Sequence, residues 1–501
     1  MTLKELKNIG RQLTIFLSMF AGCFSSLAGR RLLLAYVKGQ LSDVKRKNCE
    51  AMALKVNVPV RTLQRFLESI KWDEAKLCDR VQEIIARDHA HPEAIGIIDE
   101  SGTAKSGHST ATVARQYNGN RGKVENCTVG VHLGYWAPGF KTIMNSRLYL
   151  HKEWANDPER RKEGYIPDEV KFQTKPQIAL DLIDEALANG IIVAAWTCDE
   201  LYGRDSKFLD GLQEREQAYV AEIPCDTRVW TIKPKVISKA SAKAGQGRPK
   251  MIPRVTSKPV ACEVRNLIKY SPKFTGQAWQ QYRIKDTERG PEVWEIKWLR
   301  VCRKTATGLP SKQQTLIVAR NVRTEEVKFF LSNQVVGRNG VTLRWLLRVA
   351  FGRWSIEASF RTAKQELGMD HFEVRGWRCI HRHYYVTALS YLFCSRLRQS
   401  LDKEQTGELT VEQVRRSVNT YLTYHQFPPT LRDEEFNKEL STQHGYQTRR
   451  AQAKKSHTKT RIAFYKTLGI DVDKIKSCII VLDSHKTHDL PSKNAKVALS
   501  N

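Results

Sequence analysis

The chain has 501 residues, which is enough for about three domains. Apolar residues make up 41% of it and charged residues 27%, a balance that excludes a largely disordered chain. Lys and Arg number 82 against 53 Asp and Glu, so the formal net charge is +29. This excess indicates a polyanionic partner, most commonly nucleic acid, although a surface of solvated lysines would give the same count.

The cysteines and histidines show no metal-ligand or disulfide pattern. Eleven cysteines are scattered along the chain without a CxxC pair, which argues against a disulfide framework and a zinc ribbon. We therefore expect reduced, mostly buried thiols of a cytosolic protein. His381 and His383 have no Cys or His partner at zinc-ligand spacing, so we expect them at the surface or in contact with DNA.

An apolar segment at 13–28 follows several basic residues and in this respect resembles a secretory signal. It is short for a membrane span. Phenylalanines recur at every fourth position from Phe16, which is the spacing of one helix face. We predict a core helix here and no membrane partner.

Residues 1–90 predict an all-helical domain, because turn signals are few and apolar residues recur at helical spacing. Within it, 57–72 is typical of a turn followed by a recognition-type helix. Arg61 and Arg65 would face a DNA groove or phosphates, while Phe66 and two neighbouring leucines would pack inward. A plain helical hairpin fits the same spacing equally well.

From residue 94 onward strands alternate with helices, which implies a mixed or parallel α/β sheet. We assign 91–223 to the first part of an α/β core. The predicted strands are 94–102, 127–136, 142–150, 191–199 and 218–223, and the predicted helices are 175–190 and 206–216.

The interval 224–322 predicts a β-rich insertion in this core. Its strands 277–286, 292–304 and 315–321 are expected to be antiparallel. Residues 323–402 would complete the core, and 403–501 would form a basic C-terminal region. The helices predicted in the completing part are 324–334, 341–368 and 380–401.

Two acidic residues, Asp99 and Asp199, each end a predicted buried strand. Carboxylates at strand ends converge in the crevice of an α/β sheet and suit hard divalent cations. Two such ions can support an in-line phosphoryl transfer, with Glu357 as the candidate third ligand. An Asp after a strand is also a common helix cap or turn residue. Because Glu100 and Glu200 are adjacent, periodicity leaves the choice within each pair open.

The segment FGRWSIEASFRTAKQELGMD (351–370) resembles the signature of DDE-class insertion-sequence transposases. The matching group has a tyrosine, an arginine, the catalytic glutamate and a lysine at fixed spacing. Three residues separate Arg353 from Glu357 and six separate Glu357 from Lys364, and both gaps fit. Ala350 occupies the tyrosine position, a departure that concerns a DNA contact and not a metal ligand. Further segments that resemble one branch of this group are 61–67, 113–127 and 371–383.

The resemblance implies a ribonuclease H-like catalytic core, interrupted by a β-rich insertion and preceded by a helical DNA-binding domain. It favours Asp99 and Asp199 over the adjacent glutamates and, with Glu357, makes them ligands of Mg²⁺, for which Mn²⁺ can substitute. The implied activity is cut-and-paste transposition by a bacterial cytoplasmic, nucleoid-associated enzyme. The implied partners are double-stranded DNA, comprising terminal inverted repeats and target DNA, and a second copy of the chain. No small-molecule substrate is expected.

Basic residues near these carboxylates are predicted to contact DNA. Arg353 and Glu357 would share one face of the predicted helix 341–368, with Lys364 two turns further along. Arg grips phosphate bidentately and Lys as a point charge, whereas ordinary helix salt bridges are the structural alternative. The other predicted DNA contacts are Arg61, Arg65 and Lys123.

Two other functions stay open at this point. One is an inactive relative that acts as a sequence-specific DNA-binding protein, for which Ala350 is the supporting feature. The other is a different ribonuclease H-like nuclease, against which the helical N-terminal region and the insertion argue. Strand joining, as opposed to cutting alone, would distinguish a transposase from that nuclease.

Overall fold

A computed structural model of the chain describes residues 2–237, 253–256, 258–402, 409–424 and 428–478. The chain forms two compact units, each built from two stretches of sequence. The first unit comprises Met1–Ile192 and Trp354–Ala451, and the second comprises Val193–Arg353 and Gln452–Asn501. The end of the predicted C-terminal region, 479–501, lies outside the described residues.

The N-terminal part of the first unit is helical, as predicted. Polar side chains begin these helices: Thr2, Ser26 and Asn48 each accept a backbone N–H of the following first turn. The predicted core position of Phe16 is confirmed, but its helix ends at Ser18 and continues as a 3₁₀ turn. The elements are α1 (Leu3–Ser18), η1 (Ala21–Cys23), α2 (Leu27–Leu41), α3 (Cys49–Lys55), α4 (Val60–Glu68) and α5 (Glu74–Asp88).

An antiparallel sheet forms the centre of the first unit, with β3 paired to the three other strands. Its strands are β1 (Ile95–Ala104), β2 (Ala114–Asn118), β3 (Lys123–Ala137) and β4 (Phe140–Leu148). The remaining helices are α6 (Lys152–Ala155), α7 (Pro158–Glu163), α8 (Lys175–Ala188), α14 (Trp354–Leu367), α15 (Trp377–Leu401) and α16 (Val411–Thr423). Helix α17 (Pro429–Thr467) contributes residues to both units and contains the basic run 449–461.

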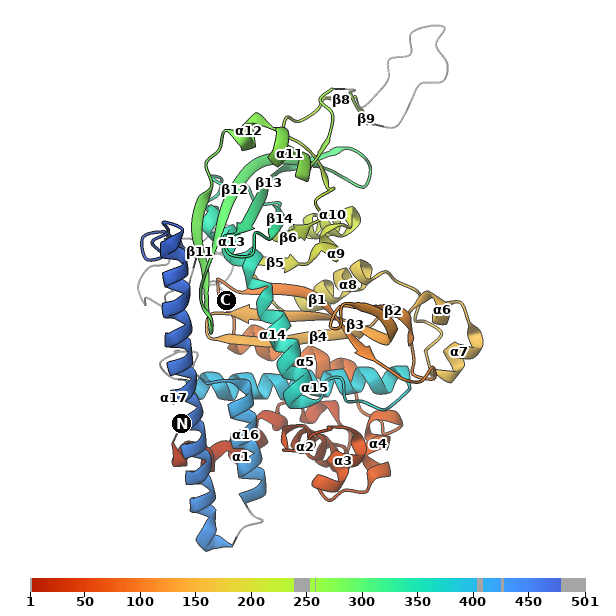
Figure 1. Ribbon diagram of the computed structural model, residues 1–501. Helices are drawn as coiled ribbons and strands as arrows, with labels where there is room; N and C mark the ends of the chain where they lie inside the picture. The colour runs from red at the N-terminus through yellow and green to blue at the C-terminus, as the bar shows by residue number, and fades with distance from the viewer. Residues whose placement is uncertain (1, 238–252, 257, 403–408, 425–427, 479–501) are drawn as a thin grey trace. The chain divides into compact units, whose positions relative to one another are not determined.

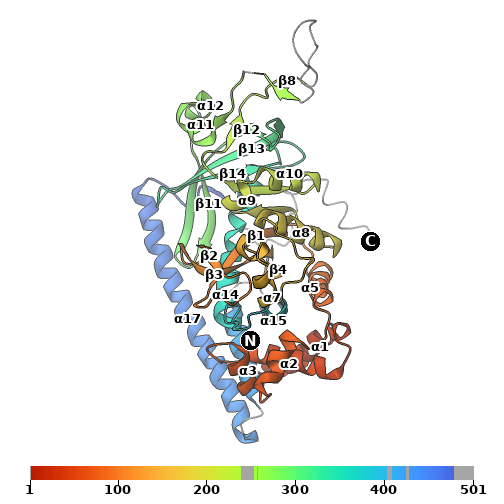
Figure 2. The same ribbon diagram turned by 90° about the vertical axis from the view of Figure 1, so that its right-hand side faces the viewer.

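Helices cover both faces of this sheet (Figure 1, Figure 2). On one face, Asn145 of β4 donates a 2.8 Å hydrogen bond to Glu185 of α8. On the other, the His132 ring of β3 lies 5.0 Å from the Phe360 ring of α14, and the Leu148 amide donates to His381 of α15. Because successive side chains of a strand alternate between the faces, the odd and even positions of β3 and β4 meet different helices.

Helix α15 joins the N-terminal helices to the sheet through buried polar contacts. The Arg382 guanidinium is fully buried and donates to the carbonyl oxygens of Phe66 and Ile70 near the end of α4. The Tyr36 hydroxyl lies 2.7 Å from His383 Nδ1, and burial lowers the pKa of His383 to about 4. His381 is buried as well, so the expectation that both histidines lie at the surface or in contact with DNA was wrong. Both lie in the first two turns of α15, where most side chains are buried, and this is the physical reason.

The second unit contains a larger, mixed sheet. Its strand order is β10-β7-β12-β13-β14-β6-β5, with β11 beside β12 and β15 beside β11. The strands are β5 (Ala195–Cys198), β6 (Tyr219–Ile223), β7 (Arg228–Trp230), β10 (Cys262–Glu263), β11 (Gln280–Thr287), β12 (Gly290–Lys304), β13 (Pro310–Asn321), β14 (Val327–Ser332) and β15 (Lys476–Ser477). A separate pair is β8 (Val236–Ile237) and β9 (Arg254–Val255). The helices are α9 (Glu200–Gly203), α10 (Ser206–Glu214), α11 (Val264–Tyr270), α12 (Pro272–Thr275) and α13 (Leu343–Gly352).

The predicted β-rich insertion continues this sheet. Strands β11, β12 and β13 are antiparallel, as expected, and β13 pairs with β14, which pairs with β6. The predicted helix at 324–334 was therefore wrong, because its centre is β14. The acidic start of this segment resembles a helix N-terminus, but the run VKFFLS lies between two paired strands, where aromatic and β-branched residues pack well.

The predicted helix 341–368 is also divided, into α13 and α14, with Arg353 between them in a turn. Gly352, a poor helix former, precedes the break. Within the part of the chain that the structure describes, no helix is long and apolar enough to cross a membrane. No disulfide joins the described cysteines. All of them except Cys225 and Cys262 are buried, which confirms the prediction of mostly buried thiols.

Candidate active site

Asp99 lies in the middle of β1. The prediction that it ends this strand was therefore wrong. The strand continues through Ala104, and Asp99 faces His132 across the antiparallel pair with β3. Its side chain is only 8% exposed. The carboxylate accepts a 2.8 Å hydrogen bond from the Glu100 amide. The sheet therefore holds this carboxylate in a fixed and largely dehydrated position.

Asp99 and Glu100 point to opposite faces of the sheet. Asp99 shares the face of its partner His132, whose ring contacts Phe360 of α14. Glu100 lies on the other face, where its Oε1 accepts a 2.7 Å ion-paired hydrogen bond from Lys175 at the start of α8. Strand pleating thus separates two adjacent acids that periodicity alone could not distinguish.

Helix α14 brings Glu357 and Lys364 to the same unit as Asp99. Ile356 is buried and fits against Gly134 of β3, so the residue before Glu357 is anchored on the sheet. Glu357 itself is exposed. Glu357 and Lys364 are seven positions apart on α14 and therefore share a face of the helix, as the signature predicted.

Lys364 is directed toward β1 and not into solvent. It is 9% exposed, and its ammonium donates to the Gly102 carbonyl oxygen at 3.2 Å. Burial lowers the pKa of Lys364, and the negative charges of Asp370 and Asp99 act in the opposite direction. Lys364 therefore lies close enough to Asp99 for their charges to interact.

His132 was missed in the sequence, although a histidine in an apolar strand is a detectable signal. It is fully buried, and its Nδ1 lies 2.7 Å from the Ser146 hydroxyl of β4. Burial, aided by the charge of Lys364, lowers the pKa of His132 to about 3. The imidazole is therefore neutral at physiological pH and adds no charge behind Asp99.

Asp199 belongs to the second unit, where it directly follows β5 as predicted. It is the N-cap of α9, and its Oδ1 accepts the Leu201 amide at 3.0 Å. Glu200, by contrast, pairs with exposed Arg204 at 2.8 Å. Asp199 thus has the helix-capping role that is common for an Asp after a strand. This cap orients its carboxylate at the carboxyl end of the parallel strand β5.

Arg353 also lies in the second unit and ends α13. It is 8% exposed, and its guanidinium lies 3.7 Å from a carboxylate oxygen of Glu222 in β6. The expectation that Arg353 and Glu357 occupy one face of a continuous helix was wrong, because the helix is interrupted between them.

The remaining predicted DNA contacts are exposed. Arg61 and Arg65 project from α4, while Leu63 and Phe66 are buried beneath them, as expected for either a recognition helix or a hairpin. Arg61 pairs with Glu68 of the same helix at 2.8 Å. Lys123 lies at the start of β3, and its side chain is 60% exposed.

Within the described residues, no three or more His, Cys, Asp or Glu side chains are grouped closely enough to hold a metal ion. Asp99 and Glu357 belong to the first unit and Asp199 to the second. The donor set itself, three carboxylates, fits a hard divalent cation such as Mg²⁺ and not a soft metal.

Residues 19–291, more than half of the chain, match the family described as DDE superfamily endonuclease. The chain belongs to this family. The match includes Asp99 and Asp199 and ends before Glu357. Endonucleases of this superfamily use divalent metal ions.

A curated relative points in the same direction. The probable transposase for insertion sequence element IS701 from Microchaete diplosiphon is 33% identical over 187 residues. This segment is 37% of the present chain and 46% of the relative, so the chain aligns with less than half of that protein. The resemblance to insertion-sequence transposases seen in the signature is supported by both comparisons.

Proposed function

We propose that this protein is a DNA transposase that cleaves DNA at the ends of a mobile element and transfers the resulting 3′-OH ends to target DNA. One observation carries the proposal. Inside the region that matches the endonuclease family, the sheet holds buried Asp99 on the face covered by α14, the helix that carries Glu357 and Lys364. A buried carboxylate beside a buried cation is a common feature of catalytic sites.

Asp99, Asp199 and Glu357 are the proposed ligands of Mg²⁺, with Mn²⁺ as a substitute. When bound, such ions supply activation of the attacking oxygen and stabilisation of the leaving oxygen. In the cleavage step a water oxygen attacks the phosphorus as the 3′ oxygen leaves, which gives a 3′-OH and a 5′-phosphate. In the joining step that 3′-OH attacks a target phosphodiester, so one P–O bond forms for each that breaks. Lys364 holds positive charge beside Asp99 throughout.

Double-stranded DNA is the proposed substrate, and a homodimer would pair the two element ends. Arg61 and Arg65 on α4 and Lys123 on β3 offer exposed cations to phosphates. Arg353 would reach DNA only by exchanging its contact with Glu222 for a phosphate. The formal net charge of +29 suits this polyanionic substrate.

The test uses purified full-length protein and labelled duplexes taken from the DNA that flanks its coding sequence, with Mg²⁺ or Mn²⁺. Asp99→Asn, Asp199→Asn and Glu357→Gln each remove one charge and little volume. Glu100→Gln and Glu200→Gln are matched controls, because each removes a neighbouring carboxylate that is bound elsewhere. We expect metal-dependent cutting that only the first three variants lose, while all five bind DNA.

Products longer than the substrate would demonstrate strand joining and distinguish a transposase from a nuclease that only cuts. Binding without cutting by the wild type, with either metal, would instead support a DNA-binding relative. Loss of cutting in Glu100→Gln equal to that in Asp99→Asn would contradict the assignment within this pair.

A further inference from the structure

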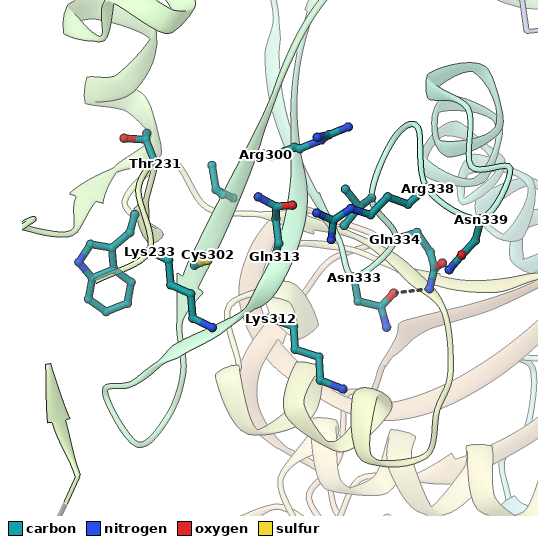
Figure 3. Close-up of a pocket in the computed structure, with 13 residues that line it drawn as sticks. Thr231, Lys233, Arg300, Cys302, Lys312, Gln313, Asn333, Gln334, Arg338 and Asn339 are labelled. Atoms are coloured by element: carbon teal, nitrogen blue, oxygen red, sulfur yellow. Dashed lines mark hydrogen bonds between the residues drawn. The ribbon is translucent and has the colours of Figure 1, made fainter. Parts of the chain in front are cut away.

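A groove of about 620 Å³ lies on the second unit, away from its predicted site residues. Strands β7, β12 and β13 form its floor, and the segment 333–339 after β14 forms one wall. Figure 3 shows Lys233, Lys312 and Arg338 around the hollow, with the Gln313 amide between them.

The groove has a one-sided charge. Lys233, Arg300, Lys312 and Arg338 all line it, and among the residues that the structure describes no acidic one does. Over the stretches that the structure describes, none of these four cations forms an ion pair. Several exposed cations elsewhere in the same unit do: the arginines at 204, 265 and 320 pair with the glutamates at 200, 263 and 295. Unneutralised cations around a hollow raise its affinity for anions.

The groove is also built on a fixed framework. Trp230, Cys302 and Gln313 stand side by side across three paired strands. Arg300 donates a 2.8 Å hydrogen bond to the Val336 carbonyl and so braces the wall. Asn339 has a left-handed backbone, φ 50°, as do Gly337 and the following Gly340, which sets the sharp turn that presents Arg338.

Polar groups complete the lining. Gln313 and Asn339 make no side-chain hydrogen bond to the described residues, whereas Asn333 uses both ends of its amide, toward Gln217 and Tyr219. An amide can both donate to and accept from the polar edges of bases or sugars.

We propose that this groove is a second DNA-contact site, which binds the phosphate backbone of duplex DNA at a distance from the bond that is cut. This inference rests on the proposed function only in taking DNA as the ligand. Several cations spread over an open groove suit successive phosphates of a strand, and the two amides add contacts between them. The site would hold element or target DNA in register while cleavage proceeds elsewhere.

The test measures binding and cutting separately. Fluorescence anisotropy in EDTA, with a labelled 30-base-pair duplex, follows DNA affinity between 50 and 200 mM salt without cleavage. The variant Lys312→Gln/Arg338→Gln removes two groove cations. The control Lys269→Gln/Arg289→Gln removes one lysine and one arginine that are exposed outside the groove of the same unit. The same proteins are then assayed for cutting with Mg²⁺.

Each phosphate contact contributes about 0.9 to the slope of log affinity against log salt. We expect the groove variant to lose up to about 1.8 from this slope, equivalent to a loss of affinity of roughly 60-fold at 0.1 M salt, while the control keeps the wild-type slope. An unchanged slope in the groove variant, or an equal decrease of the slope in the control, would overturn the proposal that the groove binds DNA. If the wild type does not cut DNA but the slopes differ as expected, DNA binding by the groove is supported and the proposed cleavage activity is contradicted.

Discussion

The contact between Gly134 and Ile356 allows a sharp test of how the sheet positions Glu357. A Cβ added at Gly134 would lie 2.2 Å from Ile356 Cδ1, far inside van der Waals contact. Its next neighbours, Ile356 Cγ1 and Ile97 Cβ, would be 3.2 and 3.7 Å away. Because Ile356 is 2% exposed, its terminal methyl has little room to move. Gly134→Ala should therefore displace α14 and the carboxylate of Glu357.

The expected magnitude follows from overpacking of a buried contact. Gly134→Ala should destabilise the first unit by about 1–3 kcal/mol, which corresponds to a fall in melting temperature of about 2–12 °C. Ile356→Val removes only the Cδ1 methyl and should cost about 0.5–1.5 kcal/mol alone. In the double variant the added Cβ occupies the space left by that methyl. Its cost should be at least 1 kcal/mol below the sum of the single effects, a coupling of roughly the size seen for residues in contact.

Differential scanning calorimetry measures the stability of the four proteins, and the cleavage assay measures their activity. We expect Gly134→Ala to lose activity and the double variant to recover much of it, because Ile356 immediately precedes Glu357 on α14. Additive effects on stability, or recovery of stability without recovery of cutting, would refute the inference that this contact positions α14 and the proposed ligand Glu357.

Three further predictions concern buried ionisable side chains in the first unit. Arg382→Met leaves several carbonyls and the Glu74 carboxylate without their buried donor, and it should lower the free energy of unfolding by about 3–5 kcal/mol. Arg378→Gln removes a half-exposed arginine from the same carboxylate and should lower it by less than about 1 kcal/mol. Equal shifts in melting temperature would contradict this prediction. The folded-state pKa of His383, about 4, lies below its ordinary value, so stability is fully present above about pH 6.5 and falls with pH toward 4. By pH 5 this histidine should cost about 2 kcal/mol, and His383→Gln should flatten the melting profile measured from pH 7.5 to 5. Lys364→Met should slow cutting roughly tenfold or more without lowering the melting temperature, because it removes a desolvated charge next to Asp99; an unchanged rate would show that this cation is not needed.

Much of the fold could be predicted from local pattern. The helical character of 1–90, the helix with a polar cap and an apolar face that became α8, and the alternating strands of the insertion were all identified, because their signals lie within a few residues. The errors share one cause. The segment 324–334 begins like a helix and becomes β14 because two distant strands pair with it, and the break at Arg353 depends on tertiary structure. Such effects of partners far along the chain are invisible to periodicity.

In the candidate site, too, some features follow from local sequence and others depend on strand pairing. The residue types and spacing of Glu357 and Lys364 carry a family resemblance, and the chemistry that this resemblance implies stays a prediction. Which of two adjacent acids faces α14 depends on how β1 pairs with β3, since a shift by one residue would exchange Asp99 and Glu100 between the faces. That register is fixed by ten paired positions of β1 and by the fit of Ile356 against Gly134. Mutations that disturb this packing should therefore act on catalysis even though they touch no ligand, and activity should follow the position of α14 more closely than overall stability.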